Sequence, residues 1–279
     1  MFQVKHMKPS DFQFATKLAN TMNWNMATED FEFMTSLEPE GCFVALQGSE
    51  RIGIATSISF GKMGWFGNLI VKEKYRSKGA GSLIVEHSIK YLQSVGVKTI
   101  GLYAYQNLHN FYSNLGFERD EDFSLLQTES LPSVLPESLP NVQKQVIKAI
   151  EEFDEGFFGG NREKLLESII LEKGNLSYYC SENKHVVGYV AATVYESMAW
   201  VGPLICETAN VDVAISLIKA VLSKLTNKSV YLVLPKKEAA LLNMLFTLGF
   251  KEDFSVTRMF LGEAAEKNCI YLAESLERG

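Results

Sequence analysis

The chain of 279 residues contains the same long pattern twice. The segment GIATSISFGKMGWFGNLIV (residues 53–71) aligns with GYVAATVYESMAWVGPLIC (residues 188–206) at an offset of 135 residues. Further along the chain, SLI at 82–84 matches SLI at 216–218, and LGF at 115–117 matches LGF at 248–250. These offsets are far longer than the repeats of solenoid proteins, which span about 20 to 50 residues. The sequence therefore predicts one fold that is present twice.

A proline-containing segment separates the two copies. In TESLPSVLPESLPNV (residues 128–142), three prolines stand four residues apart. Proline has no backbone N–H and pushes the preceding residue out of the helical region, so we expect this stretch to be extended. We predict a first domain over 1–127 (copy one), a linker over 128–141 and a second domain over 142–279 (copy two), which suits the length of the chain.

Both copies show the same order of predicted elements. Two helices come first, and in copy one Ser10 and Thr28 are good N-cap residues for them. Runs rich in β-forming residues then predict strands at 42–47, 51–60, 67–71 and 99–105. Apolar residues at helical spacing predict a helix over 82–96. Each copy is therefore expected to be an α/β unit with a mixed sheet.

The composition argues against several kinds of partner. The net charge is −6, with 12 Lys/Arg against 15 Asp/Glu over residues 1–140 and 15 against 18 over 141–279. Nucleic-acid-binding proteins normally present a basic face, so we expect no nucleic-acid partner. No apolar run approaches the roughly 18 residues of a membrane span, and the N-terminal residues do not resemble a signal peptide. Four cysteines far apart favour free thiols and a cytoplasmic location.

Residues 71–82, VKEKYRSKGAGS, concentrate positive charge beside two glycines. Four of the seven residues from Lys72 to Lys78 are basic, although the chain as a whole is acidic. The segment joins a predicted strand to a predicted helix, whose first amides have no intrahelical partner and favour an anion. Glycine lets the backbone approach such an anion closely. The pattern indicates a phosphate site, and it leaves open a tight turn surrounded by solvated charges.

Two familiar phosphate-binding motifs do not fit this segment. A P-loop needs a lysine directly after its second glycine, and Ser82 stands there instead. A dinucleotide fingerprint needs a third glycine at the position of Ile84 and an acidic residue near position 100. A nucleotide-dependent enzyme is therefore disfavoured. The motif that is present is Arg-x-x-Gly-x-Gly, from Arg76 to Gly81.

The stretch LIVKEKYRSKGAGSLIVEHSIKYL, followed by NLHNFYSNLGF, resembles the GNAT acetyltransferase superfamily. Residues 76–81 match the family's acyl-CoA signature, [Arg/Gln]-x-x-Gly-x-[Gly/Ala]. The segment NWNMATEDFEFMTSLEPEGCFVA also resembles a bacterial subgroup in which a divergent second GNAT-like domain follows the first. The resemblance covers residues 1–126 and, more weakly, 142–262. It implies two tandem GNAT-like domains, each a mixed, mostly antiparallel sheet flanked by helices, with the catalytic domain first.

The resemblance implies an N-acetyltransferase that moves an acetyl group from acetyl-CoA directly to a primary amine of a small molecule or a protein. It places the pantetheine arm on the backbone of residues 69–71 and the pyrophosphate on the amides of residues 77–82. The implied cofactor-binding residues are Leu69, Ile70, Val71, Arg76, Ser77, Lys78, Gly79, Ala80, Gly81, Ser82 and Asn107. Asn107 fits an ordinary loop asparagine equally well.

Tyr112 is the catalytic residue that the resemblance implies. In the family, the tyrosine of this short helix protonates the departing thiolate. With an ordinary pKa of about 10, a tyrosine is protonated at pH 7 and able to donate. The alternative role for Tyr112 is that of a packed aromatic beside Phe111.

No general base is assigned from the sequence. With a pKa of about 10.4, only about one lysine-like amine in 2,500 is neutral at pH 7, so a base would help. Residues 52–71 contain no acidic side chain. Carboxylates elsewhere on the substrate side, which are equally compatible with solvated surface residues, are Glu29, Asp30, Glu38 and Glu40. The histidines show no metal-binding spacing, so we expect no metal, and we expect His109 at the surface.

Copy two has lost the residues of the signature. Arg76, Gly79, Ala80 and Gly81 fall on Asn210, Val213, Ala214 and Ile215, and Tyr112 falls on Leu245. We therefore expect copy two not to bind coenzyme A in the family manner, but to complete a substrate pocket or a subunit interface, for instance that of a homodimer. The alternative from another class is a non-catalytic acyl-CoA sensor. The missing strand carboxylate favours the sensor, and Tyr112 argues against it.

Overall fold

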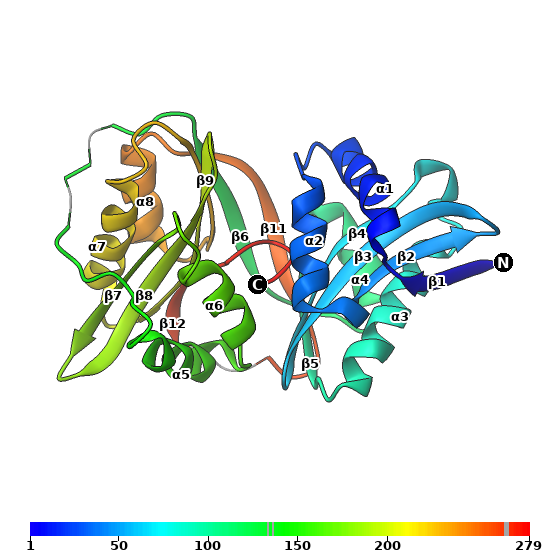
Figure 1. The fold of residues 1–279 in the computed structure, drawn as a ribbon, viewed down its shortest axis with the longest axis horizontal. Helices are drawn as coiled ribbons and strands as arrows, with labels where there is room; N and C mark the ends of the chain where they lie inside the picture. Colours follow the sequence, from blue (N-terminus) through cyan, green and yellow to red (C-terminus); the bar gives the residue numbers. More distant parts are fainter. Residues whose placement is uncertain (133, 136, 265–267) are drawn as a thin grey trace.

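The computed structural model describes residues 1–132, 134–135, 137–264 and 268–279. Two copies of one α/β unit lie side by side (Figure 1). Both show two helices, three strands, a helix, a strand, a helix and a strand in that order, which confirms the predicted α/β fold with a mixed, mostly antiparallel sheet. Two residues of the predicted linker, 133 and 136, fall outside the described residues.

The elements have the following bounds. Those of copy one are β1 Phe2–His6, α1 Pro9–Ala19, η1 Asn20–Met22, α2 Thr28–Leu37, η2 Pro39–Gly41, β2 Cys42–Gln47, β3 Glu50–Phe60, β4 Met63–Val71, η3 Glu73–Tyr75, α3 Ala80–Ser94, β5 Thr99–Ala104, η4 Gln106–Leu108, α4 His109–Ser113 and β6 Glu118–Thr128. Those of copy two are α5 Ile147–Phe158, α6 Glu163–Ile170, β7 Leu176–Glu182, β8 His185–Val194, β9 Met198–Glu207, α7 Val211–Leu222, β10 Ser229–Pro235, α8 Ala239–Thr247, β11 Lys251–Leu261 and β12 Cys269–Leu272.

Helices α1 and α2 begin earlier than the predicted caps allow. Ser10 and Thr28 lie inside these helices, so the prediction that they are N-caps was wrong. The amides of the actual N-cap residues, Lys8 and Ala27, donate to acidic side chains three residues later, at 2.9 and 2.8 Å. In both helices, the carboxylate at the third helical position therefore accepts from the backbone amide of the N-cap residue. In α1, a proline at the first helical position marks the true start of the helix in the sequence.

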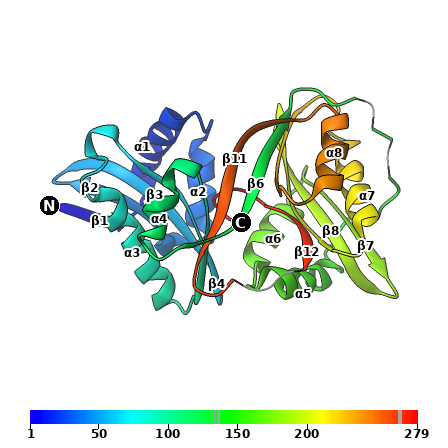
Figure 2. The same ribbon diagram turned by 180° about the vertical axis from the view of Figure 1, so that it is seen from behind.

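The two copies exchange their last strands. The sheet runs in the order β1-β2-β3-β4-β5-β11-β6-β10-β9-β8-β7, and β12 pairs with β9. Strand β11 of copy two is antiparallel to β5 of copy one, whereas β6 of copy one is antiparallel to β10 of copy two. Strands β6 and β11 pair with each other where both cross between the copies (Figures 1 and 2). Twelve strands therefore form one sheet across the whole chain.

Three apolar clusters hold the helices against this sheet. Helices α3 and α4 pack on one face of copy one, and α7 and α8 pack on the equivalent face of copy two. Helices α1, α2, α5 and α6 share a third cluster between the copies, which includes Phe31, Phe158 and Leu165. Because this cluster belongs to both copies, burial of its side chains stabilises each copy and fixes one against the other.

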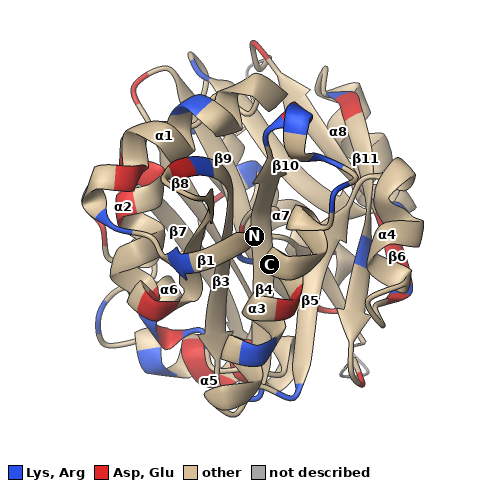
Figure 3. Cartoon of the chain, turned by 90° about the vertical axis from the view of Figure 1, so that its right-hand side faces the viewer, with Lys and Arg blue, Asp and Glu red and all other residues tan. Residues whose placement is uncertain are grey.

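The surface carries mixed charge. Figure 3 shows basic and acidic residues interspersed at the end of the molecule formed by copy one. Cys42, Cys180 and Cys206 are free thiols, as predicted. Within the described ranges, no helix combines the length and the apolar character needed to cross a membrane.

Candidate active site

The loop between β4 and α3 places backbone amides at the start of a helix. Ser77 and Gly79 have φ angles of 57° and 85°, so the chain turns sharply before α3. A Cβ on Gly79 would meet nothing within 4 Å, so the backbone conformation, rather than lack of space, favours glycine there. Within the described residues, the first amide after Arg76 that donates to a backbone carbonyl is that of Leu83. The amides from Ser77 to Ser82 are therefore available to a ligand.

Two of the four basic side chains near the loop are held by one carboxylate. The Tyr75 hydroxyl donates to Glu50 at 2.7 Å, and the Nζ atoms of Lys72 and Lys74 lie 3.0 and 2.9 Å from Glu50 Oε1. The hydrogen bonds from Tyr75, Lys74 and Lys72 lower the pKa of Glu50 from 4.5 to about 2. Glu50 thus neutralises part of the basic cluster that the sequence shows.

The other two basic side chains are bonded to the backbone. Arg76 Nε donates to the carbonyl of Val71 at 2.9 Å, and Lys78 Nζ donates to the carbonyl of Lys74 at 2.7 Å. In the part of the chain that the structure describes, neither Arg76 nor Lys78 pairs with a carboxylate. Both side chains are exposed, so their charge is available to an anion at the loop.

Strand β4 has an unpaired edge next to this loop. Strands β4 and β5 pair in parallel only from Met63 to Trp65 of β4. Asn68 then forms a bulge, because its φ is 52° and the register with β3 shifts there by one residue. Ile70 and Val71 pair with β3, but no described residue of β5 is in register with them. Their free edge can accept an extended, amide-containing ligand, as sheet edges accept peptides.

In copy two, the chain itself fills the equivalent edge. At the offset of 135, residues 69–71 of β4 correspond to residues 204–206 of β9. Strand β12 pairs antiparallel with these residues, and Leu204 lies opposite Leu272. The backbone groups that β4 leaves free are therefore paired in copy two.

The loop has also been replaced in copy two. The connection between β9 and α7 is residues 208–210, whereas the connection between β4 and α3 is residues 72–79. The positions that align with the glycine loop lie in the first turns of α7, which contain Val213 and Ile215. Neither feature of the copy-one site, the turn into the helix or the free edge, is thus repeated in the described part of copy two.

Helix α4 brings Tyr112 to the loop. A Cβ on Gly81 would lie 3.5 Å from the ring of Phe111, so α4 contacts the start of α3. Tyr112 packs against Phe111 and Phe117, with ring centroids 5.0 and 5.9 Å apart, and shares a buried cluster with Val71. Burial raises the pKa of Tyr112 above its ordinary value, so the hydroxyl is protonated at neutral pH.

Two other residues near Tyr112 differ in exposure. Asn107 is exposed in η4. His109 is only 7% exposed, and neither ring nitrogen has a hydrogen-bond partner among the described residues. The prediction that His109 lies at the surface was wrong, because His109 and Tyr112 are three residues apart and share the inner face of α4.

The carboxylates considered as bases are engaged elsewhere or point to solvent. Glu38 accepts hydrogen bonds from the Tyr91 hydroxyl, from the Ser59 amide at 2.9 Å and from Lys164 Nζ at 2.5 Å. Since Lys164 lies in α6, Glu38 links the two copies. Asp30 accepts from the amide that precedes α2, Glu40 pairs with His6 at 3.3 Å, and Glu29 is exposed.

The C-terminal tail, residues 273–279, runs between the copies to β4 (Figures 1 and 2). A Cβ on Gly67 would lie 2.6 Å from both Cα and Cβ of Glu277, so only glycine permits this approach. Trp65 Nε1 donates to the carbonyl of Leu276 at 3.3 Å. This contact could not be predicted from the sequence, because nothing in the local pattern links residues 273–279 to β4.

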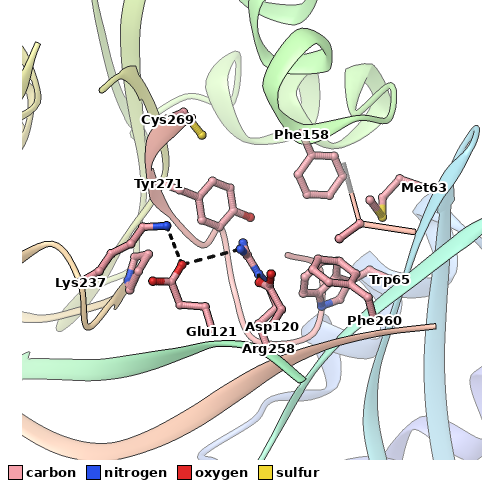
Figure 4. Close-up of a pocket in the computed structure, with 12 residues that line it drawn as sticks. Met63, Trp65, Asp120, Glu121, Phe158, Lys237, Arg258, Phe260, Cys269 and Tyr271 are labelled. Atoms are coloured by element: carbon pink, nitrogen blue, oxygen red, sulfur yellow. Dashed lines mark hydrogen bonds and ion pairs between the residues drawn. The ribbon is translucent and has the colours of Figure 1, made fainter. Parts of the chain in front are cut away.

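A separate pocket of about 40 Å³ lies between the copies (Figure 4). Its charged side chains pair with one another: Arg258 Nε lies 2.5 Å from Asp120, and Lys237 Nζ lies 2.7 Å from Glu121. None of the predicted site residues is among the described residues that line this pocket. The Arg258–Asp120 pair joins β11 to β6. We therefore attribute this pocket to the packing of the exchanged strands.

Within the described residues, one cluster of three carboxylates is close-packed enough to hold a metal ion. Glu151, Glu163 and Glu167 of α5 and α6 can bring one oxygen each within 4.8 Å of the others. They belong to copy two and include no residue of the glycine loop, β4 or α4.

Family models match both copies of the chain. Residues 11–117 match the acetyltransferase (GNAT) family, and residues 150–271 match an acetyltransferase (GNAT) domain. No curated protein matches the chain.

Solved structures share the fold over nearly the whole chain. A protein from Pyrococcus horikoshii is 21% identical with a TM-score of 0.81, covering 100% of this chain and 96% of that one. A GCN5-related N-acetyltransferase from Sphaerobacter thermophilus is 12% identical with a TM-score of 0.70, covering 96% and 98%. A tandem GNAT protein from the clavulanic acid biosynthesis pathway is 12% identical with a TM-score of 0.64, covering 93% and 98%. With a GNAT match in each copy, this chain belongs to the GNAT acetyltransferase family as a tandem protein with two GNAT domains.

Proposed function

We propose that the chain is an N-acetyltransferase that moves an acetyl group from acetyl-CoA directly to a primary amine of a small molecule or a protein. The observation that carries the proposal is the contrast between two equivalent strand edges. Residues 204–206 of copy two pair with β12, whereas residues 69–71 of copy one face an unpaired side beside the glycine loop. An unpaired strand edge next to free helix amides suits a substrate with an amide-containing arm and a pyrophosphate.

Two parts of acetyl-CoA, the pantetheine arm and the pyrophosphate, have a proposed place on copy one. The backbone of Leu69, Ile70 and Val71 would pair with the pantetheine arm. The amides from Ser77 to Ser82 would hold the pyrophosphate, with the side chains of Arg76 and Lys78 adding charge. Charge-assisted hydrogen bonds of this kind contribute about 1.5–3 kcal/mol each. Exposed Asn107 is a further candidate contact.

Acetyl-CoA supplies the thioester, and Tyr112 would supply the proton that the departing sulfur needs. Tyr112 is protonated at neutral pH and lies in the cluster that includes Val71 at the end of β4. The apolar surroundings that raise the pKa of the phenol would also raise that of a thiol, so proton transfer between them is not strongly uphill. We include in the proposal a cytoplasmic location with no nucleic-acid or membrane partner.

The alternative is a protein that binds acyl-CoA without turnover. Release of free coenzyme A, measured with a panel of primary amines, separates the two functions. We expect turnover by the wild type and a loss of about 100-fold in Tyr112→Phe, since acid catalysis contributes about 10²–10⁴. The matched control is Tyr231→Phe, which removes a hydroxyl from β10 in copy two and should leave turnover unchanged. Binding of coenzyme A without turnover for any amine would favour the sensor.

A further inference from the structure

The C-terminal tail fixes one carboxylate against β4. Glu277 packs on Gly67, the residue just before the Asn68 bulge. Its neighbour Leu276 is held by Trp65, and the carbonyl of Gly279 accepts from Arg162 Nη1 at 3.0 Å. The backbone on both sides of Glu277 is therefore anchored, and the side chain is held in one place on β4.

Glu277 has a carboxylate oxygen to spare, whereas its neighbour Glu274 has none. Both oxygens of Glu274 are taken by the Arg278 guanidinium, at 2.7 and 3.0 Å, and the Glu274 side chain is 2% exposed. Glu277 is 22% exposed, and its Oε1 lies 3.1 Å from Arg278 Nη1. Among the described residues, its Oε2 has no hydrogen bond or ion pair to another side chain. Glu277 can therefore accept a proton on Oε2 while Oε1 keeps its contact with Arg278.

The groups around Glu277 come from three elements. Glu274 and Arg278 belong to the tail, Asp30 belongs to α2, and Tyr195 follows β8. Burial raises the pKa of Glu277; Arg278 opposes this shift, and the negative charges of Glu274 and Asp30 add to it. A carboxylate with a raised pKa is a better proton acceptor than an ordinary one.

We propose that Glu277 binds the ammonium group of the acceptor and takes its proton. This inference rests on the proposed function. A pantetheine arm paired with Val71, Ile70 and Leu69 would end at the Asn68 bulge. The next residue along β4 is Gly67, on which Glu277 packs. Tyr112 belongs to the cluster on the α3 side of the sheet. Trp65, which holds the tail next to Glu277, belongs to the cluster between the copies. The proposed acid and base therefore lie on opposite faces of β4.

The step balances in atoms and charge. The ammonium nitrogen gives one proton to a Glu277 oxygen, and its lone pair then forms the C–N bond with the acetyl carbon. The C–S bond breaks, the sulfur takes the Tyr112 proton, and the second proton lost by nitrogen returns through water to Tyr112. Glu277 releases its proton to solvent, so the products are the amide, the free thiol and one proton.

The test compares wild type with Glu277→Gln over a range of pH, using coenzyme A release with putrescine. Without a base, only neutral amine reacts, and its fraction rises tenfold per pH unit up to a pKa of about 10. We expect Glu277→Gln to lose about 100-fold or more near pH 7 and to approach the wild type near pH 10. Glu277→Asp should keep the wild-type shape of the pH profile at a lower rate.

A second acceptor sharpens the test. A peptide α-amine has a pKa of about 7.8, so about one molecule in seven is neutral at pH 7 and the loss in Glu277→Gln should be much smaller than with putrescine. Ser275→Ala removes a tail hydroxyl that accepts from the Arg278 amide at 3.1 Å and leaves every charge around Glu277 in place, so it should keep the wild-type pH profile. If the wild type is active and Glu277→Gln lowers the rate by the same factor at every pH, the proposed role of Glu277 is overturned, whereas the proposed function stands. A wild type that releases no coenzyme A with any amine overturns the proposed function, and this inference with it.

Discussion

Leu204 lies opposite Leu272 in the ladder between β9 and β12, and this pairing closes in copy two the strand edge that stays open in copy one. The equivalent residue of copy one, Leu69, has no described β5 residue in register with it. Because the two copies share one fold, copy two shows how the edge is satisfied by a polypeptide. The open edge of copy one is therefore where we propose that the arm of acetyl-CoA pairs.

The loop glycine can be tested with a matched pair of variants. Gly79 and Gly48 both have left-handed φ angles, 85° and 60°, and a Cβ on either would meet nothing within 4 Å. Alanine at each site should cost about 1–2 kcal/mol of unfolding free energy, measured in urea. Only Gly79→Ala should weaken coenzyme A binding, by about tenfold or more in calorimetry, because Gly48 is in the β2–β3 turn. Equal binding by both variants would remove the loop from the site.

The Asp154–Arg162 pair should be among the most sensitive to mutation. Both side chains are fully buried, and Arg162 Nη2 lies 2.6 Å from Asp154 Oδ2. Asp154→Ala leaves a buried charge without its partner, so we expect a loss of about 3–5 kcal/mol in chemical denaturation at pH 7. The control is Lys236→Ala, whose exposed pair with Glu252 should contribute no more than about 1 kcal/mol. A loss of the same size in both variants would contradict this prediction.

Two buried tyrosines should respond in opposite directions to loss of the hydroxyl. The Tyr271 hydroxyl, in the pocket of Figure 4, interacts with the Tyr103 hydroxyl but forms no hydrogen bond of normal geometry with it or with any other described residue. The Tyr189 hydroxyl donates to Asp154. Tyr271→Phe should therefore raise the unfolding free energy by about 0.5–2 kcal/mol, because it removes an unsatisfied polar group, whereas Tyr189→Phe should lower it. Thermal unfolding of the two variants checks the signs, and destabilisation by Tyr271→Phe would show that the hydroxyl has a partner.

Glu50 should make stability depend on acid pH. Its folded pKa is about 2 against an ordinary 4.5, so its stabilising contacts with Tyr75, Lys74 and Lys72 are complete above pH 4.5. They are lost as the pH falls toward 2 and the carboxyl becomes protonated. The difference in unfolding free energy between wild type and Glu50→Gln should therefore shrink between pH 5 and pH 2. A difference that stays constant over this range would show that Glu50 does not titrate with folding.

Local features could be predicted from the sequence, whereas contacts between distant strands could not. The glycine loop and the helix predicted over 82–96 depend on neighbouring residues. The loop lies where we expected it, and the helix, Ala80–Ser94, begins and ends two residues earlier. The strand exchange could not be predicted, because backbone ladders do not depend on which of two similar strands supplies the partner.

One signal for the tail was present in the repeat. Gly67 and Gly202 match each other, and the tail crosses both: a Cβ on Gly202 would lie 2.0 Å from the Ala273 carbonyl oxygen, and one on Gly67 would lie 2.6 Å from Glu277. Each glycine leaves room for the backbone of the tail. From the sequence, they show only that two positions need glycine, and not which segment passes over them.

The strand exchange sets the order in which the chain can fold during synthesis. Strand β5 is complete once residue 104 has been made, but its neighbour β11 ends at residue 261. The ribosome must therefore have made the residues up to 261 before β5 gains its second neighbour. Until then the outer edge of β5 is exposed, and β6 is the nearest strand able to pair with it in error. Copy one is translated first, yet it cannot mature before copy two.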